Sequence, residues 1–251
     1  MCGRYELHSQ PAAIALAFGL DLPPDITPRY NIAPTQLVPI VRVNGAGQRE
    51  LVQMRWGLVP RWARDPSIGA KLINARGETA ASKASFRAAY RWHRCLVPAN
   101  GFYEWMPTTR GKQPVHVGMS DNRPFGLAGL YERWLAPDGE ALDTCTIVTT
   151  EANALLHAIH ERMPLIVAPE DYDRWLDPEE PDPADLIASF PENEMRWRKV
   201  STRVNSVKND DANCITALVE DEEEASSEAA PELPDEISDE EELAPVQTSL
   251  F

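Results

Sequence analysis

Short apolar runs, some alternating with polar residues and some continuous, follow one another through the first 150 positions of the chain. Each run is bounded by Gly, Pro, Asn or Asp residues, a pattern typical of β-strands. The runs are LVPIVRV at 37–43, LVQMRWGLV at 51–59, VHVGM at 115–119, FGLAGLY at 125–131 and TCTIVTT at 144–150. We therefore expect a chain that is rich in strands.

Turn-forming residues separate two pairs of these runs. The segment NGAG at 44–47 separates the first run from the second, and DNRP at 121–124 separates the third from the fourth. Residues of these types favour tight reversals of the backbone. Both pairs of runs are therefore predicted to form antiparallel hairpins.

Helical signals are fewer. Ser9 can cap a helix formed by PAAIALAF, and Thr150 can cap a helix formed by EANALLHAIH. Two further short helices are expected at 171–176 and 183–189. Because strands and helices do not alternate regularly, the pattern predicts an α+β fold with a curved or barrel-like, mainly antiparallel sheet and a few peripheral helices.

The net charge of −15 is concentrated at the end of the chain. Residues 220–251 contain 13 Asp and Glu and no Lys or Arg, which leaves a net charge of −2 for residues 1–219. Low hydrophobicity and dense like charge predict a disordered acidic linker at 220–246. The chain is thus divided into a domain at 2–219, this linker, and a terminal peptide at 247–251. Because the domain is nearly neutral, the negative net charge of the whole chain does not exclude binding to a polyanionic partner.

Several classes of protein are disfavoured. No run of about 18 apolar residues is present, and MCGRYELHSQ lacks the layout of a secretory signal, so we expect a cytoplasmic protein without membrane association. The cysteines form no CxxC pair, which argues against a zinc site or a disulfide framework, and Cys95, Cys145 and Cys214 are expected to be buried. His157 and His160 have the spacing of one helix face but no third ligand. We expect no metal and no cofactor.

Cys2 differs from the other cysteines because removal of Met1 would place it at the amino terminus. An α-amine has a pKa of about 7.7–8.0 and a thiol one of about 8.5, so beside a cation such as Arg4 both are expected to be appreciably deprotonated near neutral pH. Against an acyl carbon, the thiolate would attack while the amine takes its proton. Against an aldehyde, the amine would form a Schiff base onto which the thiol closes as a thiazolidine. An inert cysteine in an edge strand is the third interpretation.

Longer motifs in the sequence distinguish among these three interpretations of Cys2. They are CGRY at 2–5, RYNIAPTQ at 29–36, RWGLVPRW at 55–62, INARGET at 73–79, CLVPANGFYEW at 95–105, HERMP at 160–164 and VNSVKND at 204–210. Together they resemble the SOS-response-associated peptidase family of abasic-site processing proteins. The resemblance covers residues 2–215 and leaves out the acidic tail. Members of that family crosslink their N-terminal cysteine to abasic sites in single-stranded DNA.

The resemblance implies a catalytic set. Cys2 corresponds to the crosslinking nucleophile, and Asn74 to an asparagine whose amide holds the α-amine or the opened sugar. Glu104 corresponds to a glutamate whose pKa should be raised by desolvation between two aromatic residues, which suits proton transfer. His160 corresponds to a histidine that handles protons during Schiff-base formation and ring opening. A thiazolidine would shield the site from strand cleavage; lyase activity and removal of Met1 are further activities implied.

A basic stretch indicates how DNA is held. Between positions 55 and 94 there are nine Lys and Arg, two acids and three interleaved tryptophans, Trp56, Trp62 and Trp92, which is typical of a single-strand channel. A solvated basic face with core tryptophans would give the same pattern. The resemblance places Trp62 and Arg76 at the DNA groove. Weaker candidates lie beside the catalytic motifs: Arg4, Trp105, Arg162 and Lys208.

The last five residues, QTSLF, resemble the short peptide by which bacterial replication and repair proteins bind the β sliding clamp. The resemblance implies that Gln247 donates or accepts a hydrogen bond while Leu250 and Phe251 fill an apolar pocket. A monomer that is associated with the nucleoid or the replication fork is expected.

Two other classes of function stay open. The MCG start is shared with N-terminal-nucleophile glutamine amidotransferases, although their further glutamine-recognition motifs are not found here. A noncatalytic, clamp-tethered DNA-binding adaptor with an inert Cys2 is the other alternative. Glutaminase activity would identify the first class, and absence of a covalent DNA adduct the second.

Overall fold

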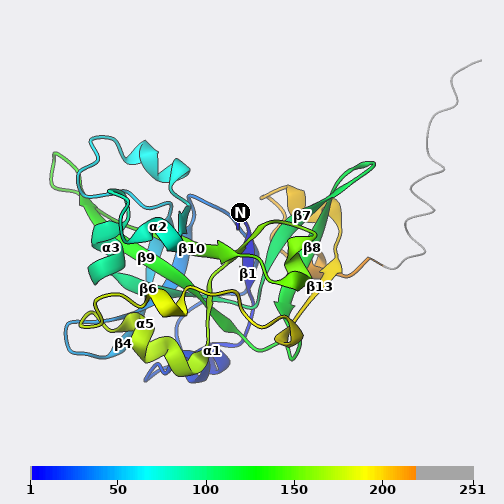
Figure 1. The fold of residues 1–251 in the computed structure, drawn as a ribbon, viewed down its shortest axis with the longest axis horizontal. Helices are drawn as coiled ribbons and strands as arrows, with labels where there is room; N and C mark the ends of the chain where they lie inside the picture. Colours follow the sequence, from blue (N-terminus) through cyan, green and yellow to red (C-terminus); the bar gives the residue numbers. More distant parts are fainter. Residues whose placement is uncertain (1, 219–251) are drawn as a thin grey trace, which may run out of the picture. The chain divides into compact units, whose positions relative to one another are not determined.

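The strands form two sheets. The computed structural model describes residues 2–218, and within them eight strands form one sheet and five the other (Figure 1). The larger sheet contains a closed circuit, because β10 pairs with β4 on one side and with β9 on the other. The strands of this circuit are β3 (Leu37–Val43), β4 (Arg49–Trp56), β6 (Arg94–Ala99), β9 (Phe125–Leu135) and β10 (Ala141–Glu151). The expected barrel-like α+β fold is confirmed.

Three short strands extend the barrel: β5 (Asn74–Arg76) and β11 (Arg162–Pro164) pair with β10, and β12 (Ile166–Val167) pairs with β9. The second sheet has the order β13-β8-β7-β1-β2. Its strands are β1 (Tyr5–Leu7), β2 (Arg29–Ile32), β7 (Gly101–Thr108), β8 (Gly111–Met119) and β13 (Met195–Lys199). In Figure 1 the amino-terminal strand β1 lies between the barrel and β7. Pairing is mainly antiparallel, and the β10 pairs with β4 and β5 are parallel.

One of the two predicted hairpins is correct. β3 and β4 pair antiparallel across the NGAG turn, from Leu37 opposite Arg55 to Val43 opposite Arg49. The prediction that 115–119 pairs with 125–131 is wrong, because β8 pairs with β7 and β13 whereas β9 pairs with β6, β10 and β12. The turn between them carries the chain from one sheet to the other. Turn residues reverse the backbone, but the burial of each apolar face decides which strands pair.

The helices are short and partly differ from the expectation. α1 (Pro11–Phe18) occupies the predicted position, but its N-cap is Gln10, because the Ser9 hydroxyl accepts a hydrogen bond from Asn100 Nδ2 at 2.7 Å. α5 (Tyr172–Leu176) is confirmed, and 183–189 holds only a 3₁₀ turn at Ala184–Leu186. Two helices follow β5, α2 (Gly77–Ala80) and α3 (Arg87–Trp92).

The predicted cap at Thr150 is wrong, because β10 continues through that residue to Glu151. α4 (Ala154–His157) is instead capped by Asn153, whose side chain accepts from Leu156 N at 3.1 Å. Cys95, Cys145 and Cys214 are buried free thiols, as expected. Within residues 2–218 no helix is long and apolar enough to cross a membrane. The predicted linker and clamp peptide lie outside the described residues.

Gly57 determines how the chain leaves the barrel. It follows β4 with a φ of +128°, and a Cβ at this position would lie 2.7 Å from the carbonyl oxygen of Gly69. We expect Gly57→Ala to lower the free energy of unfolding by about 2 kcal/mol, because it adds left-handed strain to a backbone clash. Gly45→Ala, where no atom lies within 4 Å of the new Cβ, is the control. Equal midpoints of urea unfolding for the two variants would contradict this assignment.

Candidate active site

The amino-terminal strand places Cys2 beside Glu104. Tyr5 pairs with Phe102, and Tyr103 N donates to Arg4 O at 2.9 Å, so the same register brings the residues before Arg4 alongside Glu104 on β7. The Cys2 thiol is fully buried. Burial and the neighbouring negative charge of Glu104 raise the pKa of this thiol to about 12. Loss of hydration therefore opposes ionisation of this thiol; the expected deprotonation of Cys2 after removal of Met1 stays a prediction.

Glu104 is the acidic group of the site. Its side chain is 6% exposed, and burial raises the pKa of its carboxyl group, as its aromatic neighbours predicted. A positive charge on His160 opposes this shift, which shows that the two groups lie within electrostatic reach of each other. Residues from the two sheets, one on β7 and one just before β11, are thus brought together. A carboxyl group with a raised pKa can act as a proton donor as well as a proton acceptor.

Hydrogen bonds around Nδ1 orient His160. The backbone N–H of Arg162 donates to Nδ1 at 2.9 Å. With Nδ1 as an acceptor, the neutral ring carries its proton on Nε2. His160 can therefore offer an N–H from Nε2 while its other nitrogen stays fixed by the backbone.

The guanidinium group of Arg162 connects β11 to α2. Its two terminal nitrogens bind the Glu78 carboxylate at 2.7 and 2.9 Å, and Nη2 also donates to Thr149 O at 2.7 Å. The backbone of Arg162 thus contacts His160, whereas its guanidinium group is bound to Glu78 and Thr149. A phosphate group that binds Arg162 would compete with Glu78, a residue that sequence reasoning did not select.

Asn74, the fourth predicted catalytic residue, lies on the barrel strand β5. It lies opposite Ile147, and its Nδ2 donates to Ile147 O at 3.5 Å. Its Oδ1 atom is buried and accepts no hydrogen bond from the described residues. Buried acceptors are normally satisfied, so this oxygen is available to a donor that enters the site. Arg76, two residues later on the same strand, is exposed.

Arg4 and Trp105 form a second group. The Arg4 guanidinium carbon lies 5.7 Å from the centroid of the Trp105 ring, and Trp105 Nε1 donates to Asn205 Oδ1 at 2.7 Å. Arg4 Nη1 donates to Asn31 Oδ1 at 2.6 Å. Sequence reasoning did not select Asn31 or Asn205. Both lie in motifs that it used, but no strand was predicted at 29–32, so no signal in the sequence indicated that Asn31 is buried.

The basic stretch divides into surface and structural residues. Trp62 is 58% exposed on the loop after β4 and donates to Ala84 O at 3.2 Å. Trp56 is fully buried, and Arg94, at 4% exposure, donates to the backbone carbonyl groups of Tyr90, Trp175, Asp177 and Glu180. Counting charges along the chain therefore overstated the basic surface, because it cannot separate a buried arginine from an exposed one.

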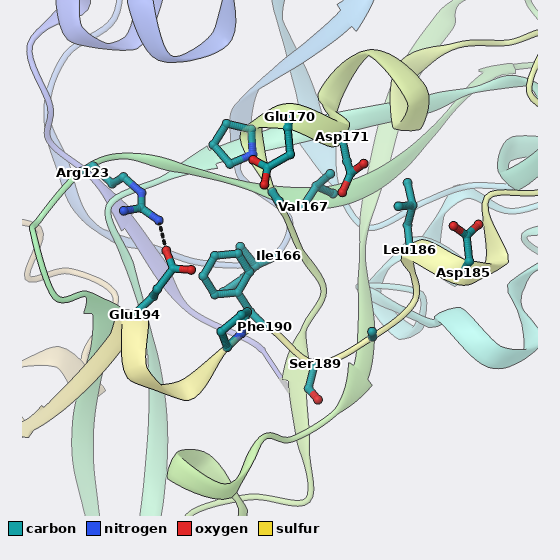
Figure 2. A pocket seen from close by; sticks show the side chains of 14 residues that line it. Arg123, Ile166, Val167, Glu170, Asp171, Asp185, Leu186, Ser189, Phe190 and Glu194 are labelled. Carbon is teal, nitrogen blue, oxygen red and sulfur yellow. Dashed lines mark hydrogen bonds and ion pairs between the residues drawn. The ribbon is translucent and has the colours of Figure 1, made fainter.

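A cavity of about 370 Å³ lies elsewhere in the domain (Figure 2). Its apolar lining includes Ile166, Val167 and Phe190, and Arg123 binds Glu194 at its edge at 2.5 Å. None of the predicted site residues lines it. Within residues 2–218, no three His, Cys, Asp or Glu side chains are arranged to hold a metal ion.

The closed barrel, the second sheet and the cysteine buried beside a carboxyl group define an α+β protein with a candidate reactive group at its amino terminus. The family model described as SOS response associated peptidase (SRAP) matches residues 1–207. The chain belongs to this family, so the resemblance drawn from its motifs is confirmed.

Two proteins with similar sequences are both named abasic site processing protein. Abasic site processing protein YoqW of Bacillus subtilis is 41% identical over 224 residues, which cover 86% of this chain and 99% of that protein. Abasic site processing protein HMCES of Gallus gallus is 34% identical over 223 residues, covering 76% of this chain and 66% of that protein. A crystal structure of a protein from Bacteroides thetaiotaomicron has a TM-score of 0.77 at 26% identity, covering 87% of this chain and all of that one.

Proposed function

We propose that this protein processes abasic sites in single-stranded DNA by forming a covalent thiazolidine crosslink through Cys2 after Met1 has been removed. The relatives named above are abasic site processing proteins. The observation that carries the proposal is the burial of Cys2 beside Glu104, with His160 in electrostatic reach of that carboxyl group. This set joins an amine, a thiol and two proton-transfer groups.

The proposed reaction begins with the amine, because the thiol is neutral. The α-amine of Cys2 attacks the aldehyde carbon of the opened deoxyribose, and the carbinolamine loses water to give an iminium ion. Glu104 in its protonated form, or His160 through Nε2–H, donates the proton that leaves with the hydroxyl group. The Cys2 sulfur then bonds to the iminium carbon, and its proton passes to the Glu104 carboxylate. The nitrogen becomes a neutral amine within the ring.

Ring closure explains why a thiol is needed. An iminium ion acidifies the neighbouring sugar carbon and promotes loss of the 3′ phosphate, which breaks the strand. The thiazolidine removes the iminium and thus shields the site. A neutral thiol suits this addition to a strong electrophile better than direct attack on an acyl carbon, for which a thiolate is required.

Intact mass spectrometry of the protein after incubation with an abasic single-stranded oligonucleotide tests the proposal. The expected mass is that of the chain without Met1 plus the oligonucleotide minus one water. An oligonucleotide with all its bases is the control. No adduct would favour the noncatalytic adaptor, and release of ammonia from glutamine would favour the amidotransferase class.

The single-stranded DNA is proposed to follow a groove in which cations bind the phosphates and aromatic rings stack on the bases. The cations are Arg4, Arg76, Arg162 and Lys208, and the rings are those of Trp62 and Trp105. With about four phosphate contacts, affinity for single-stranded DNA should fall about 50-fold between about 50 and 200 mM salt. Fluorescence anisotropy measures this dependence.

A single variant examines the same groove. Arg76→Ala should reduce the slope of log affinity against log salt by about 0.7. Arg133→Ala, which removes an exposed cation bound to Asp143 on the barrel, is the control and should leave the slope unchanged. Binding that is insensitive to salt would contradict a groove that follows the phosphates.

The terminal peptide 247–251 is proposed to bind the bacterial β sliding clamp and thereby to concentrate the protein at replication forks. We expect deletion of Gln247–Phe251 to abolish retention on immobilised clamp without changing the rate of crosslinking in solution. Replacing the same residues with five alanines is the matched control for chain length and should give the same loss. Retention of the truncated protein on the clamp would reject this partner.

A further inference from the structure

Asn31, a buried residue of β2, connects the amino-terminal strand to the segment 204–210. Its side chain is fully buried. Oδ1 accepts the hydrogen bond from Arg4 Nη1 at 2.6 Å. Nδ2 faces three backbone carbonyl oxygens of the segment at 2.6 to 3.2 Å, those of Val204, Ser206 and Asn209. One side chain thus satisfies groups from two distant parts of the chain.

Asp210 fixes the other end of the same segment. Its Oδ1 atom accepts hydrogen bonds from the backbone N–H groups of Tyr30 and Asn31, at 2.6 and 2.8 Å, and its Oδ2 binds Arg29 Nε. The segment forms no strand with β2; residues Thr202–Asn205 form a 3₁₀ turn. Its position against β2 therefore depends on these side-chain hydrogen bonds together with the apolar packing of Val204.

The segment in turn determines where three candidate DNA contacts lie. Asn205 holds the Trp105 indole at 2.7 Å, and Val204 O accepts a second hydrogen bond from Arg4 Nη1 at 2.7 Å. Lys208 is exposed on the same segment. The cation of Arg4 lies just before β1, the aromatic ring of Trp105 on β7 and the ammonium group of Lys208 on the segment, and Asn31 contacts both Arg4 and the segment.

We infer that Asn31 is a positioning residue, which holds Arg4, Trp105 and Lys208 as one preformed surface for the phosphates and bases of single-stranded DNA. This inference rests on the proposed function. Its physical basis is preorganisation: side chains that are ordered on folding lose little further entropy when DNA binds. Arg4 needs this support in particular, because a long side chain beside the reacting Cys2 would otherwise sample many rotamers.

Asn31→Asp tests the inference with almost no change of shape. The variant keeps an acceptor for Arg4 but places a carboxylate oxygen against three carbonyl oxygens, where the amide had donated. The half-saturating concentration of abasic single-stranded DNA for crosslinking should rise about tenfold, while the maximal rate constant stays within about threefold. Trypsin should also cleave after Lys208 faster than in the wild type when DNA is absent.

A double-mutant cycle separates positioning from general destabilisation. Asn205→Ala releases Trp105 from an exposed position and should weaken DNA binding in the wild type. In the Asn31→Asp background it should have no further effect. Asn213→Ala, another exposed asparagine whose side chain forms no hydrogen bond within residues 2–218, is the control.

An unchanged half-saturating concentration for Asn31→Asp would overturn the inference, as would additive effects in the cycle. If Asn31→Asp does not fold, the inference predicts weaker binding and faster cleavage after Lys208 for Asn205→Ala alone, and wild-type behaviour of that variant would overturn it. Proteolysis requires no DNA, so unchanged cleavage in Asn31→Asp would also overturn it independently of the proposed function. If the wild type forms no adduct, the proposed function fails, and proteolysis still decides whether Asn31 positions the segment.

Discussion

Cys2→Ser should reduce the heat-stable DNA adduct at least about 100-fold. The amine remains and still forms a Schiff base, but a hydroxyl group is a far weaker nucleophile than sulfur and does not close a stable ring. The iminium then persists, so cleavage of the abasic strand should continue or increase. Denaturing electrophoresis after heating measures the adduct and the cleaved strand in the same lanes.

Cys145→Ser is the matched control, because it places the same hydroxyl group at another fully buried thiol, in the barrel. It should form as much adduct as the wild type. A Cys2→Ser protein that still forms a heat-stable adduct would rule out the thiazolidine and point to a different nucleophile.

Glu104→Gln should slow crosslinking about 100-fold at saturating DNA, because the amide neither donates the proton for dehydration nor accepts the thiol proton. When proton donation by Glu104 limits the rate, only the protonated carboxyl group is active. The wild-type rate then falls as pH rises through the raised pKa of Glu104, because the protonated fraction decreases. The Gln variant should lose this part of the pH profile. Single-turnover kinetics across a pH series measures both effects.

Glu104→Gln should slow crosslinking but should not lower the stability of the protein. A carboxyl group whose pKa is raised on folding stabilises the protein least when it is ionised, so stability is lost as pH rises from the unfolded pKa through the folded pKa. The Gln variant removes this loss and should melt at or above the wild-type temperature at neutral pH. Glu161→Gln, an exposed neighbour of His160, is the control. A wild-type rate for Glu104→Gln would exclude its catalytic role.

The effects expected for Cys2→Ser and Glu104→Gln share one cause, which is burial at the junction of the two sheets. Burial raises the pKa of both the Cys2 thiol and the Glu104 carboxyl group, so the same environment disfavours charge on both groups. The proposed reaction then starts from the amine. Later transfer of the thiol proton to Glu104 is concerted with bond formation to an electrophile, so no free thiolate is required.

Local signals predicted most strands of the barrel. The run 37–43 and its NGAG turn predicted β3 and its pairing with β4, because both partners and the turn lie within 20 residues. The pairing of β8 with β13 was not predictable in this way. Its partner β13 lies about 80 residues later in the chain, and local propensity contains no information about such a contact.

The sequence by itself determined the family, the position of Cys2 next to Met1, the motifs that contain Asn74, Glu104 and His160, and the segregation of acidic charge at residues 220–251. These are properties of residue order and composition. Only the tertiary structure decided that burial disfavours ionisation of the Cys2 thiol, that Arg94 is structural and that Asn31 joins Arg4 to the segment 204–210. Each of these depends on desolvation and hydrogen bonds between residues that are distant in the chain, and therefore on how the two sheets pack.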